Sequence, residues 1–159
     1  MPQKKESNLP VWEDAYTNDT YQTIEDFEEY TMGFVYLIDF SDGTKYLGKK
    51  VLYTQLWIPR GNSLKKHPKS VKVKSRNTGN GYRKVYDLVI RESSWKTYKG
   101  SSSETAKRTP IKRTILAKAY SERELTYLET KYLFLHNVLE DEAFLNGNIL
   151  GKFFKGNLR

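Results

Sequence analysis

The sequence contains no cysteine, which excludes disulfide scaffolds, zinc ribbons and cysteine nucleophiles. Histidine is also scarce, because His67 and His136 are too few for a His-rich zinc site or a histidine acid–base pair. The longest hydrophobic run, residues 34–38, is far shorter than the roughly 20 residues that a membrane span needs. No hydrophobic signal segment follows Met1. We therefore expect a protein without membrane contact that works in the cytoplasm.

Positive charge is concentrated in the middle of the chain. The 159 residues have a net charge of +8, but residues 49–118 hold 19 basic and 3 acidic side chains, whereas residues 1–48 hold 3 basic and 10 acidic. Such a basic block is typical of a phosphate-binding surface. The aromatic residues within it favour nucleic acid, because rings pack on bases and sugars. The alternative is a solvated surface that only keeps the protein soluble.

A β-hairpin is predicted at the start of the main domain. Residues 34–40 form an apolar run typical of a central strand, residues 41–43 are a turn signal, and residues 44–48 form the returning strand. A three-residue loop with Gly43 in the left-handed conformation pairs Ile38 with Tyr46. Tyr36 and Tyr46 then lie on the same face as diagonal neighbours, whereas a two-residue loop would place them on opposite faces.

The remaining pattern predicts an α+β fold with a small central antiparallel sheet of about three strands flanked by helices. Further strands are expected at residues 84–90 and 111–119, and a capping box at Ser121 starts a helix that runs to about Asn137. We divide the chain into an acidic N-terminal extension (1–32) and a single domain (33–159). Residues 61–81 have the composition of a basic loop, which we expect to be a flexible phosphate-binding arm.

The predicted helix carries the candidate acid. Glu129 falls about 40° from Leu125 around the helix axis, at the edge of the apolar stripe that contains Leu128 and Tyr132. A carboxylate in that position can reach a metal ion beside the sheet. The alternative is an ordinary carboxylate on the helix surface.

These residues resemble a known nuclease family. Gly33-Phe34-Val35-Tyr36 and Tyr46-Leu47-Gly48 are similar to the two-part signature of the GIY-YIG nucleases. The Lys49-Lys50 continuation and the Ser-x-Trp-x-x-Tyr-x-Gly-Ser pattern at residues 93–101 resemble the phage-encoded, Seg-like homing endonucleases. Residues 127–131 resemble the family's glutamate helix, and residues 144–147 its terminal asparagine segment. The resemblance covers about residues 33–150.

The resemblance implies a DNA endonuclease that hydrolyses phosphodiester bonds with one divalent metal, Mg²⁺ or Mn²⁺, by nicking or by double-strand cleavage. It assigns Glu129 as the metal ligand and Asn146 as a supporting residue. It assigns Tyr36 and Tyr46 to position or deprotonate the attacking water. A tyrosine with an ordinary pKa near 10 needs cationic neighbours to act as a base. We expect Lys49 and Lys50 to be those neighbours.

The sequence departs from the family at its catalytic arginine, which the family carries on a helix just after the second tyrosine strand. Here the next arginine is Arg60, and the preceding Pro59 is a poor helix residue. Lys50, Arg83 and Arg91 are the alternatives, and Arg91 adjoins the matching Ser-x-Trp segment. If none of them reaches the phosphate, the protein is a non-catalytic nucleic-acid-binding protein on the same scaffold.

DNA, in double-stranded form, is the expected partner, and the chain is a monomer or a homodimer. The expected DNA contacts come from the basic block and its neighbours: Lys49, Arg60, Lys65, Lys66, Lys72, Lys74, Arg76, Arg83, Trp95, Lys96 and Ser101. For Trp95 the alternative is a place in the core. The opposite charges of the N-terminal and middle segments also suggest that residues 1–30 cover the basic face and restrain non-specific binding.

Overall fold

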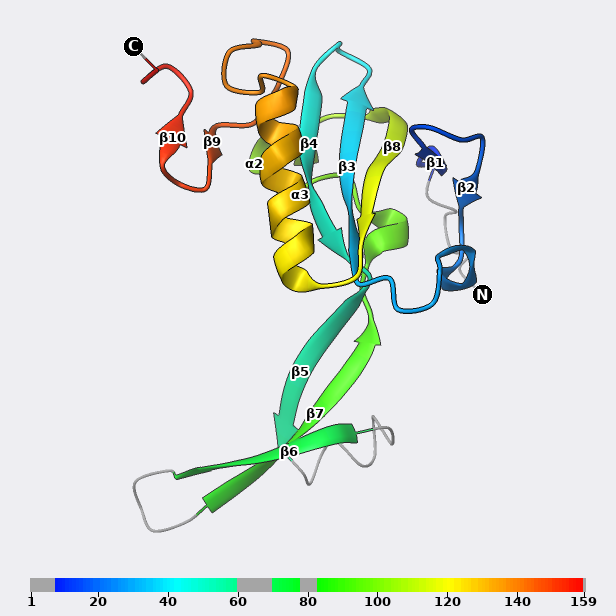
Figure 1. The fold of residues 1–159 in the computed structure, drawn as a ribbon, viewed down its shortest axis with the longest axis vertical. Helices are drawn as coiled ribbons and strands as arrows, with labels where there is room; N and C mark the ends of the chain where they lie inside the picture. The colour runs from blue at the N-terminus through cyan, green and yellow to red at the C-terminus, as the bar shows by residue number, and fades with distance from the viewer. Residues whose placement is uncertain (1–7, 60–69, 78–82, 159) are drawn as a thin grey trace. The chain divides into compact units, whose positions relative to one another are not determined.

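A computed structural model describes residues 8–59, 70–77 and 83–158 (Figure 1). The chain divides into two compact units. The first unit comprises the chain up to residue 52 and from residue 94 onward, and the second comprises residues 53–93. The predicted single domain therefore consists of two units.

A mixed five-stranded sheet forms the frame of the first unit, with the strand order β2-β1-β8-β3-β4. The strands are β1 (Trp12–Asp14), β2 (Thr20–Tyr21), β3 (Gly33–Phe40), β4 (Lys45–Val51) and β8 (Pro110–Ala119). The three strands β8, β3 and β4 are antiparallel, as predicted, and β1 pairs in parallel with β8. The α+β class is confirmed, and the sheet is larger than the three strands expected.

The two additional strands come from the acidic N-terminal segment. Trp12 is buried in the core, and its Nε1 donates a hydrogen bond to the carbonyl of Trp95 at 3.0 Å. Tyr21 and Phe27 are buried in the same cluster. Residues 8–32 are therefore part of the first unit, and residue 32 is not a domain boundary. A deletion of residues 1–30 would remove core side chains as well as acidic charge.

Helix α3 (Glu122–Leu135) covers one face of the sheet and packs on β3, β4 and β8 (Figure 1). It starts where the capping box predicts, because the Ser121 hydroxyl accepts a hydrogen bond from the Glu124 N–H at 3.2 Å. The shorter elements are η1 (Ile24–Asp26), η2 (Trp95–Thr97), α2 (Ser103–Ala106), β9 (Asn148–Ile149) and β10 (Phe153–Phe154).

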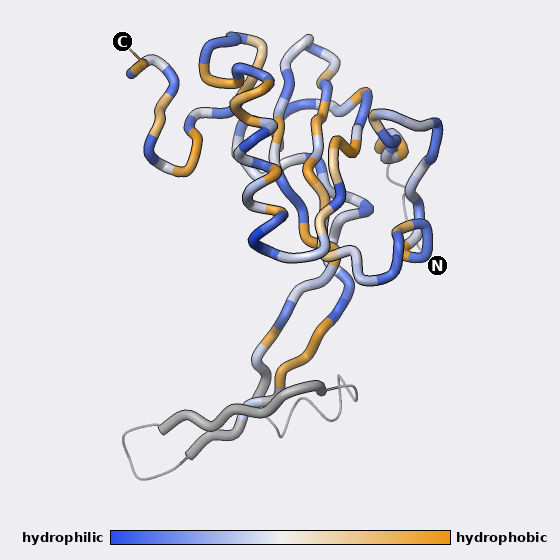
Figure 2. Tube along the Cα trace, in the orientation of Figure 1, coloured by the Kyte–Doolittle hydropathy of each residue, from blue (hydrophilic) through white to orange (hydrophobic). Residues whose placement is uncertain are grey.

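The sheet separates two hydrophobic clusters. Phe34, Tyr36 and Trp95 belong to the cluster on one face, and Val35 and Leu125 belong to the cluster under α3. This arrangement explains why β3 is apolar at consecutive positions, since a central strand between two covered faces buries both sets of side chains. Figure 2 shows this concentration of hydrophobic residues in the central strands and the alternation of hydrophobic and hydrophilic residues along α3.

The predicted hairpin register is confirmed. Phe40 N donates to Thr44 O at 2.9 Å, Ile38 pairs with Tyr46, and Gly43 has a left-handed φ of 84°. A residue other than glycine pays a steric penalty at this φ, so Gly43 sets the three-residue loop and through it the register of the strands.

The second unit is a three-stranded antiparallel sheet in the order β5-β7-β6. Its strands are β5 (Tyr53–Pro59), β6 (Ser70–Asn77) and β7 (Arg83–Glu92). The prediction of a loop without secondary structure over residues 61–81 is wrong for Ser70–Asn77, which form β6. Within the described ranges, none of the helices has the length and hydrophobicity that a membrane crossing requires.

Candidate active site

Two tyrosines lie side by side on β3 and β4. The ring centroids of Tyr36 and Tyr46 are 6.3 Å apart, as expected for diagonal neighbours on one face. Gly48 is paired with Tyr36, and a Cβ atom at Gly48 would lie 2.6 Å from the Tyr36 hydroxyl. The glycine of the motif is therefore required because the Tyr36 ring lies directly over its backbone.

The Tyr36 hydroxyl is buried and has no hydrogen-bond partner among the described residues. Burial raises the pKa of Tyr36 well above its ordinary value, and the nearby Tyr98, Tyr46 and Glu129 add to the rise. An unpaired buried hydroxyl is costly, so Tyr36 has unused hydrogen-bonding capacity in this part of the core.

Tyr46 lies at the border between the core and a polar pocket. Its hydroxyl is 2.9 Å from the Ser101 hydroxyl, and burial raises its pKa above the ordinary value. The pocket has a volume of about 280 Å³, and Tyr46, Ser102, Glu129 and Asn148 contribute to its lining. The site therefore opens to a cavity with mainly polar walls.

The free edge of β4 explains the role of Asn146. Even-numbered residues of β4 bond to β3, so the backbone groups of Lys45, Leu47 and Lys49 face the edge. The Asn146 side chain accepts from Leu47 N at 3.1 Å and donates to Leu47 O at 2.7 Å. The oxygen and the nitrogen of the buried Asn146 amide thus both bond to the backbone of β4. Asn146 holds the C-terminal segment against β4 and is a positioning residue.

Glu129 projects from α3 toward the free edge of β4 near Lys49, which follows Leu47 as the next residue whose backbone faces that edge. The Lys49 backbone N–H and ammonium lower the pKa of Glu129, but burial outweighs them and raises it above the ordinary value. The carboxylate also raises the pKa of both Tyr36 and Tyr46. Glu129 and Tyr46 line the same polar pocket. Glu129 is half-buried and lines the polar pocket, which favours a site residue over an ordinary helix-surface carboxylate.

Lys50 shares a face of β4 with Tyr46 and Gly48. Its Nζ lies 4.2 Å from the centroid of the Tyr98 ring and donates to the Ser94 hydroxyl at 3.4 Å. The Tyr98 ring is in turn 5.5 Å from the Tyr36 ring. Partial burial lowers the pKa of Lys50, and none of the ion pairs among the described residues includes it. Lys50 is thus a cation beside the tyrosines.

The side chains of Lys49 and Arg113 form hydrogen bonds with other parts of the first unit. Lys49 Nζ donates to the Thr126 hydroxyl on α3 at 2.8 Å. The Arg113 guanidinium donates to the carbonyls of Pro10, Lys96 and Tyr98 at 2.6–2.9 Å, and burial lowers its pKa to about 10. The only sequence signal for this buried clamp is an arginine in an alternating strand, which does not predict its three carbonyl partners. Arg113 secures the segments around the site and is not available to a phosphate.

The other predicted DNA contacts divide into three groups. Trp95 is fully buried in the core, so its predicted contact with DNA is wrong, whereas Lys96 is exposed. Arg60, Lys65 and Lys66 lie outside the described residues. The backbones of the remaining basic residues belong to the second unit, with Lys72, Lys74 and Arg76 on β6 and Arg83 and Arg91 on β7.

The metal-binding potential of the site rests on a single carboxylate. Across the parts of the chain that the structure describes, three or more Asp, Glu or His side chains do not gather into a ready-made cluster. Glu129 with its polar pocket and the unpaired Tyr36 hydroxyl nevertheless suits Mg²⁺ or Mn²⁺. Mg²⁺ in particular takes oxygen ligands and keeps several waters.

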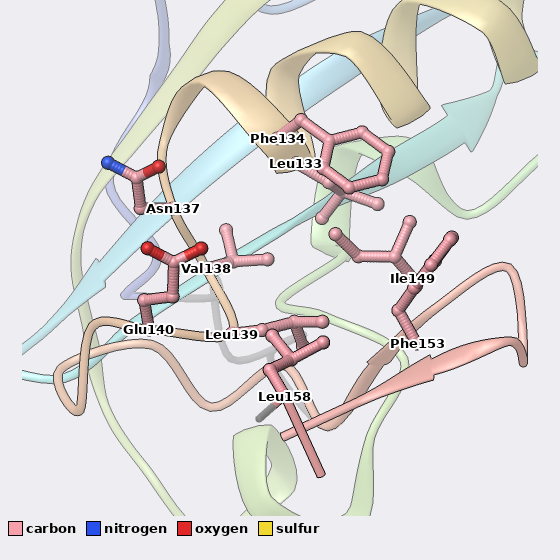
Figure 3. A pocket seen from close by; sticks show the side chains of 9 residues that line it. All are labelled: Leu133, Phe134, Asn137, Val138, Leu139, Glu140, Ile149, Phe153 and Leu158. Atoms are coloured by element: carbon pink, nitrogen blue, oxygen red, sulfur yellow. The ribbon is translucent and has the colours of Figure 1, made fainter. Parts of the chain in front are cut away.

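A second, apolar cavity of about 250 Å³ lies between the end of α3 and the C-terminal segment (Figure 3). Phe134 on α3 faces Ile149 and Phe153 across it. Neither tyrosine of the site lines this cavity, and among the described residues of its lining Glu140 is the one with a charge. The polar pocket beside Glu129 is therefore the candidate active site.

The comparisons with known proteins identify the family. The family model described as "Putative endonuclease segE, GIY-YIG domain" matches residues 12–149. No curated protein and no solved structure matches the chain. The match includes the N-terminal strands and both tyrosine strands, as well as Glu129 and Asn146. The chain therefore belongs to the SegE GIY-YIG endonuclease family.

Proposed function

We propose that the protein is a metal-dependent DNA endonuclease that hydrolyses phosphodiester bonds at the edge of β4. The observation that carries this proposal is that Tyr46 and Glu129 line one polar pocket, with the Tyr36 ring 6.3 Å from the Tyr46 ring. The three residues come from β3, β4 and α3, so only the folded first unit brings them together. The family resemblance also supports a homing-type role on phage DNA.

Glu129 would hold the divalent cation, with water filling the rest of the coordination shell. The bound cation supplies Lewis acidity, which lowers the pKa of water and offsets charge on the phosphate. The Lys49 backbone N–H lies near this carboxylate and favours its ionised form. Glu129 must be ionised to serve as a ligand, so its raised pKa predicts weaker metal binding as the pH falls.

Tyr36 and Tyr46 orient the attacking water as neutral hydroxyls. Their raised pKa values keep both hydroxyls protonated near neutral pH, which argues against a phenolate base. Attack by the water oxygen forms one bond to phosphorus and breaks the bond to the leaving oxygen. The water releases a proton in this step, and the leaving oxygen gains one from solvent.

Lys50 provides the positive charge that the missing arginine would supply in the family. Its ammonium lies beside Tyr98 on the face that carries both tyrosines. A fixed cation in a partly water-excluded site stabilises charge that develops on the phosphate. Arg83 and Arg91 belong to the second unit and remain the alternatives for this role.

The test is incubation of supercoiled plasmid with purified protein in Mg²⁺, in Mn²⁺ and in EDTA. Wild-type protein should convert the plasmid to nicked or linear forms only with metal. Glu129→Gln should remove this activity, and Glu122→Gln, an exposed change on the same helix, should keep it. Plasmid that is shifted in a gel but never cut, with any metal, would instead support the non-catalytic nucleic-acid-binding protein.

A further inference from the structure

The excess positive charge belongs entirely to the second unit. Residues 53–93 contain 10 basic and 2 acidic side chains, a net charge of +8, whereas the rest of the chain contains 17 of each. A neutral unit gives little long-range attraction to a polyanion, because its positive and negative charges balance. The second unit must therefore supply most of the electrostatic attraction to DNA.

The strand register divides these charges unequally between the two faces of the second unit. Lys72 pairs with Leu88, Lys74 with Tyr86 and Arg76 with Lys84. Successive strand positions alternate between faces, so these positions all share one face of the sheet. Its charged positions among the three strands are Lys72, Lys74, Arg76, Lys84 and Glu92, a net charge of +3.

The opposite face has a smaller net charge, +1 against +3, although the basic face also has apolar positions at Leu88 and Ile90. Positions of the opposite face in the register include Leu56, Val73, Val85 and Val89, and its charged positions are Arg83, Asp87 and Arg91. The basic face instead carries aromatic positions at Tyr53, Trp57 and Tyr86. Tyr53 and Trp57 are 42% and 40% exposed, which leaves ring surface that can pack on sugars.

The spacing of the basic positions suits duplex DNA. Alternate residues of a strand are about 6.6 Å apart, because each residue advances the strand by about 3.3 Å. Each DNA strand rises about 3.4 Å per phosphate along the helix axis and also winds around it, so neighbouring phosphates are farther apart than this rise and closer to the spacing of the basic positions. A β-ribbon of this kind also fits the major groove of the duplex.

We propose that the face of the second unit with Lys72, Lys74, Arg76 and Lys84 is the docking surface for duplex DNA. It supplies most of the binding affinity, and the first unit supplies the chemistry. The choice of DNA as the polyanion rests on the proposed function. The division of charge and the register of β5, β6 and β7 are independent of it.

The test measures binding of full-length protein carrying Glu129→Gln to a fluorescent 20-base-pair duplex in EDTA, by anisotropy over a range of salt concentrations. The test variant adds Lys72→Gln, Lys74→Gln and Arg76→Gln. The control instead adds Lys107→Gln, Lys112→Gln and Lys131→Gln, three exposed residues of the first unit. Both lose three charges. Circular dichroism checks that each variant is folded.

The test variant should bind at least roughly tenfold more weakly at low salt, and the slope of log K against log salt should fall by about 3, close to one per lost phosphate contact. The control variant should bind the duplex with nearly the affinity and the salt dependence of the Glu129→Gln parent protein. Lys84→Gln alone should lower the slope by about 1, which keeps the test available if the triple variant does not fold.

An equal loss of duplex affinity in the test variant and in the control would overturn the proposal. The total charge, and not this face, would then determine the affinity. Tighter binding to a single-stranded competitor of the same length would overturn the assignment to duplex DNA. Binding through this face without any cleavage by wild-type protein would contradict only the nuclease proposal. Cleavage that depends on Glu129 but not on this face would contradict only the docking proposal.

Discussion

The two units of this protein differ in what holds their functional residues. In the first unit, Tyr36 and Glu129 are placed by strand register, helix capping and two buried clusters, and the net charge of the unit is zero. The second unit is a sheet of three strands with a net charge of +8. Chemistry needs groups held at fixed positions, whereas attraction to a polyanion needs mainly charge. A chain with a net charge of +8 thus contains a neutral unit, which carries the proposed active site.

The largest expected effect is the loss of stability when a core side chain of the first unit is removed. Trp12→Ala removes a fully buried ring from the N-terminal strand and should lower the free energy of unfolding by about 3–5 kcal/mol. Urea denaturation measures this change. Tyr16→Ala, at an exposed ring of the same segment, is the control and should cost far less. A small effect of Trp12→Ala would mean that residues 8–32 contribute little to the stability of the first unit.

Removal of the Lys50 charge should lower the cleavage rate without loss of DNA affinity. Lys50→Met keeps the length of the side chain and should reduce the single-turnover rate by roughly 100-fold, the usual effect of losing one electrostatic stabiliser. Lys50→Arg should retain much more activity. If Lys50→Met cuts normally, the cation comes from the second unit, and Arg83→Met and Arg91→Met become the variants to measure.

A methyl group at Gly48 should disturb the tyrosine pair. In Gly48→Ala the new Cβ would lie 2.6 Å from the Tyr36 hydroxyl, so the ring must move, at a cost of about 1–3 kcal/mol in stability. Cleavage should fall because Tyr36 moves from its position, while duplex binding stays normal. Thermal unfolding and plasmid cleavage test the two effects, and Gly147→Ala, where a Cβ has open space, is the matched control.

The smallest effect concerns the pH dependence of stability. Burial raises the pKa of Glu129, so ionisation of this carboxyl favours the unfolded state. Its contribution to stability is fully present below its ordinary pKa and is lost as the pH rises through the raised value. Without metal, Glu129→Gln should therefore be slightly more stable than wild type at neutral pH and equal to it in acid. Denaturation at several pH values in EDTA measures the difference, and a less stable variant at neutral pH would contradict the account.

The sequence predicted the hairpin and the glutamate helix because local rules determine them. Gly43 and the three-residue turn set the register, and Ser121 sets the start of α3. The sequence therefore correctly predicts that Tyr36 and Tyr46 lie on one face.

The features that the sequence did not predict depend on contacts between distant segments. β1 has three residues in an acidic segment, and it is a strand because Trp12 fills a space beside Trp95 and β8. The basic and polar composition of β6 predicts a loop, but pairing with β7 compensates for its weak strand propensity. The role of Asn146 follows from the free edge of β4, which no local pattern reveals.

The central claim is that cleavage belongs to the first unit and affinity to the second. The most direct measurement is the single-turnover cleavage rate as a function of protein concentration, for the Lys72, Lys74 and Arg76 triple variant and for Glu129→Gln. The triple variant should need a higher protein concentration but should reach nearly the wild-type rate at saturation. Glu129→Gln should saturate at the wild-type concentration with no measurable cutting. A triple variant whose saturating rate falls as far as that of Glu129→Gln would contradict the claim.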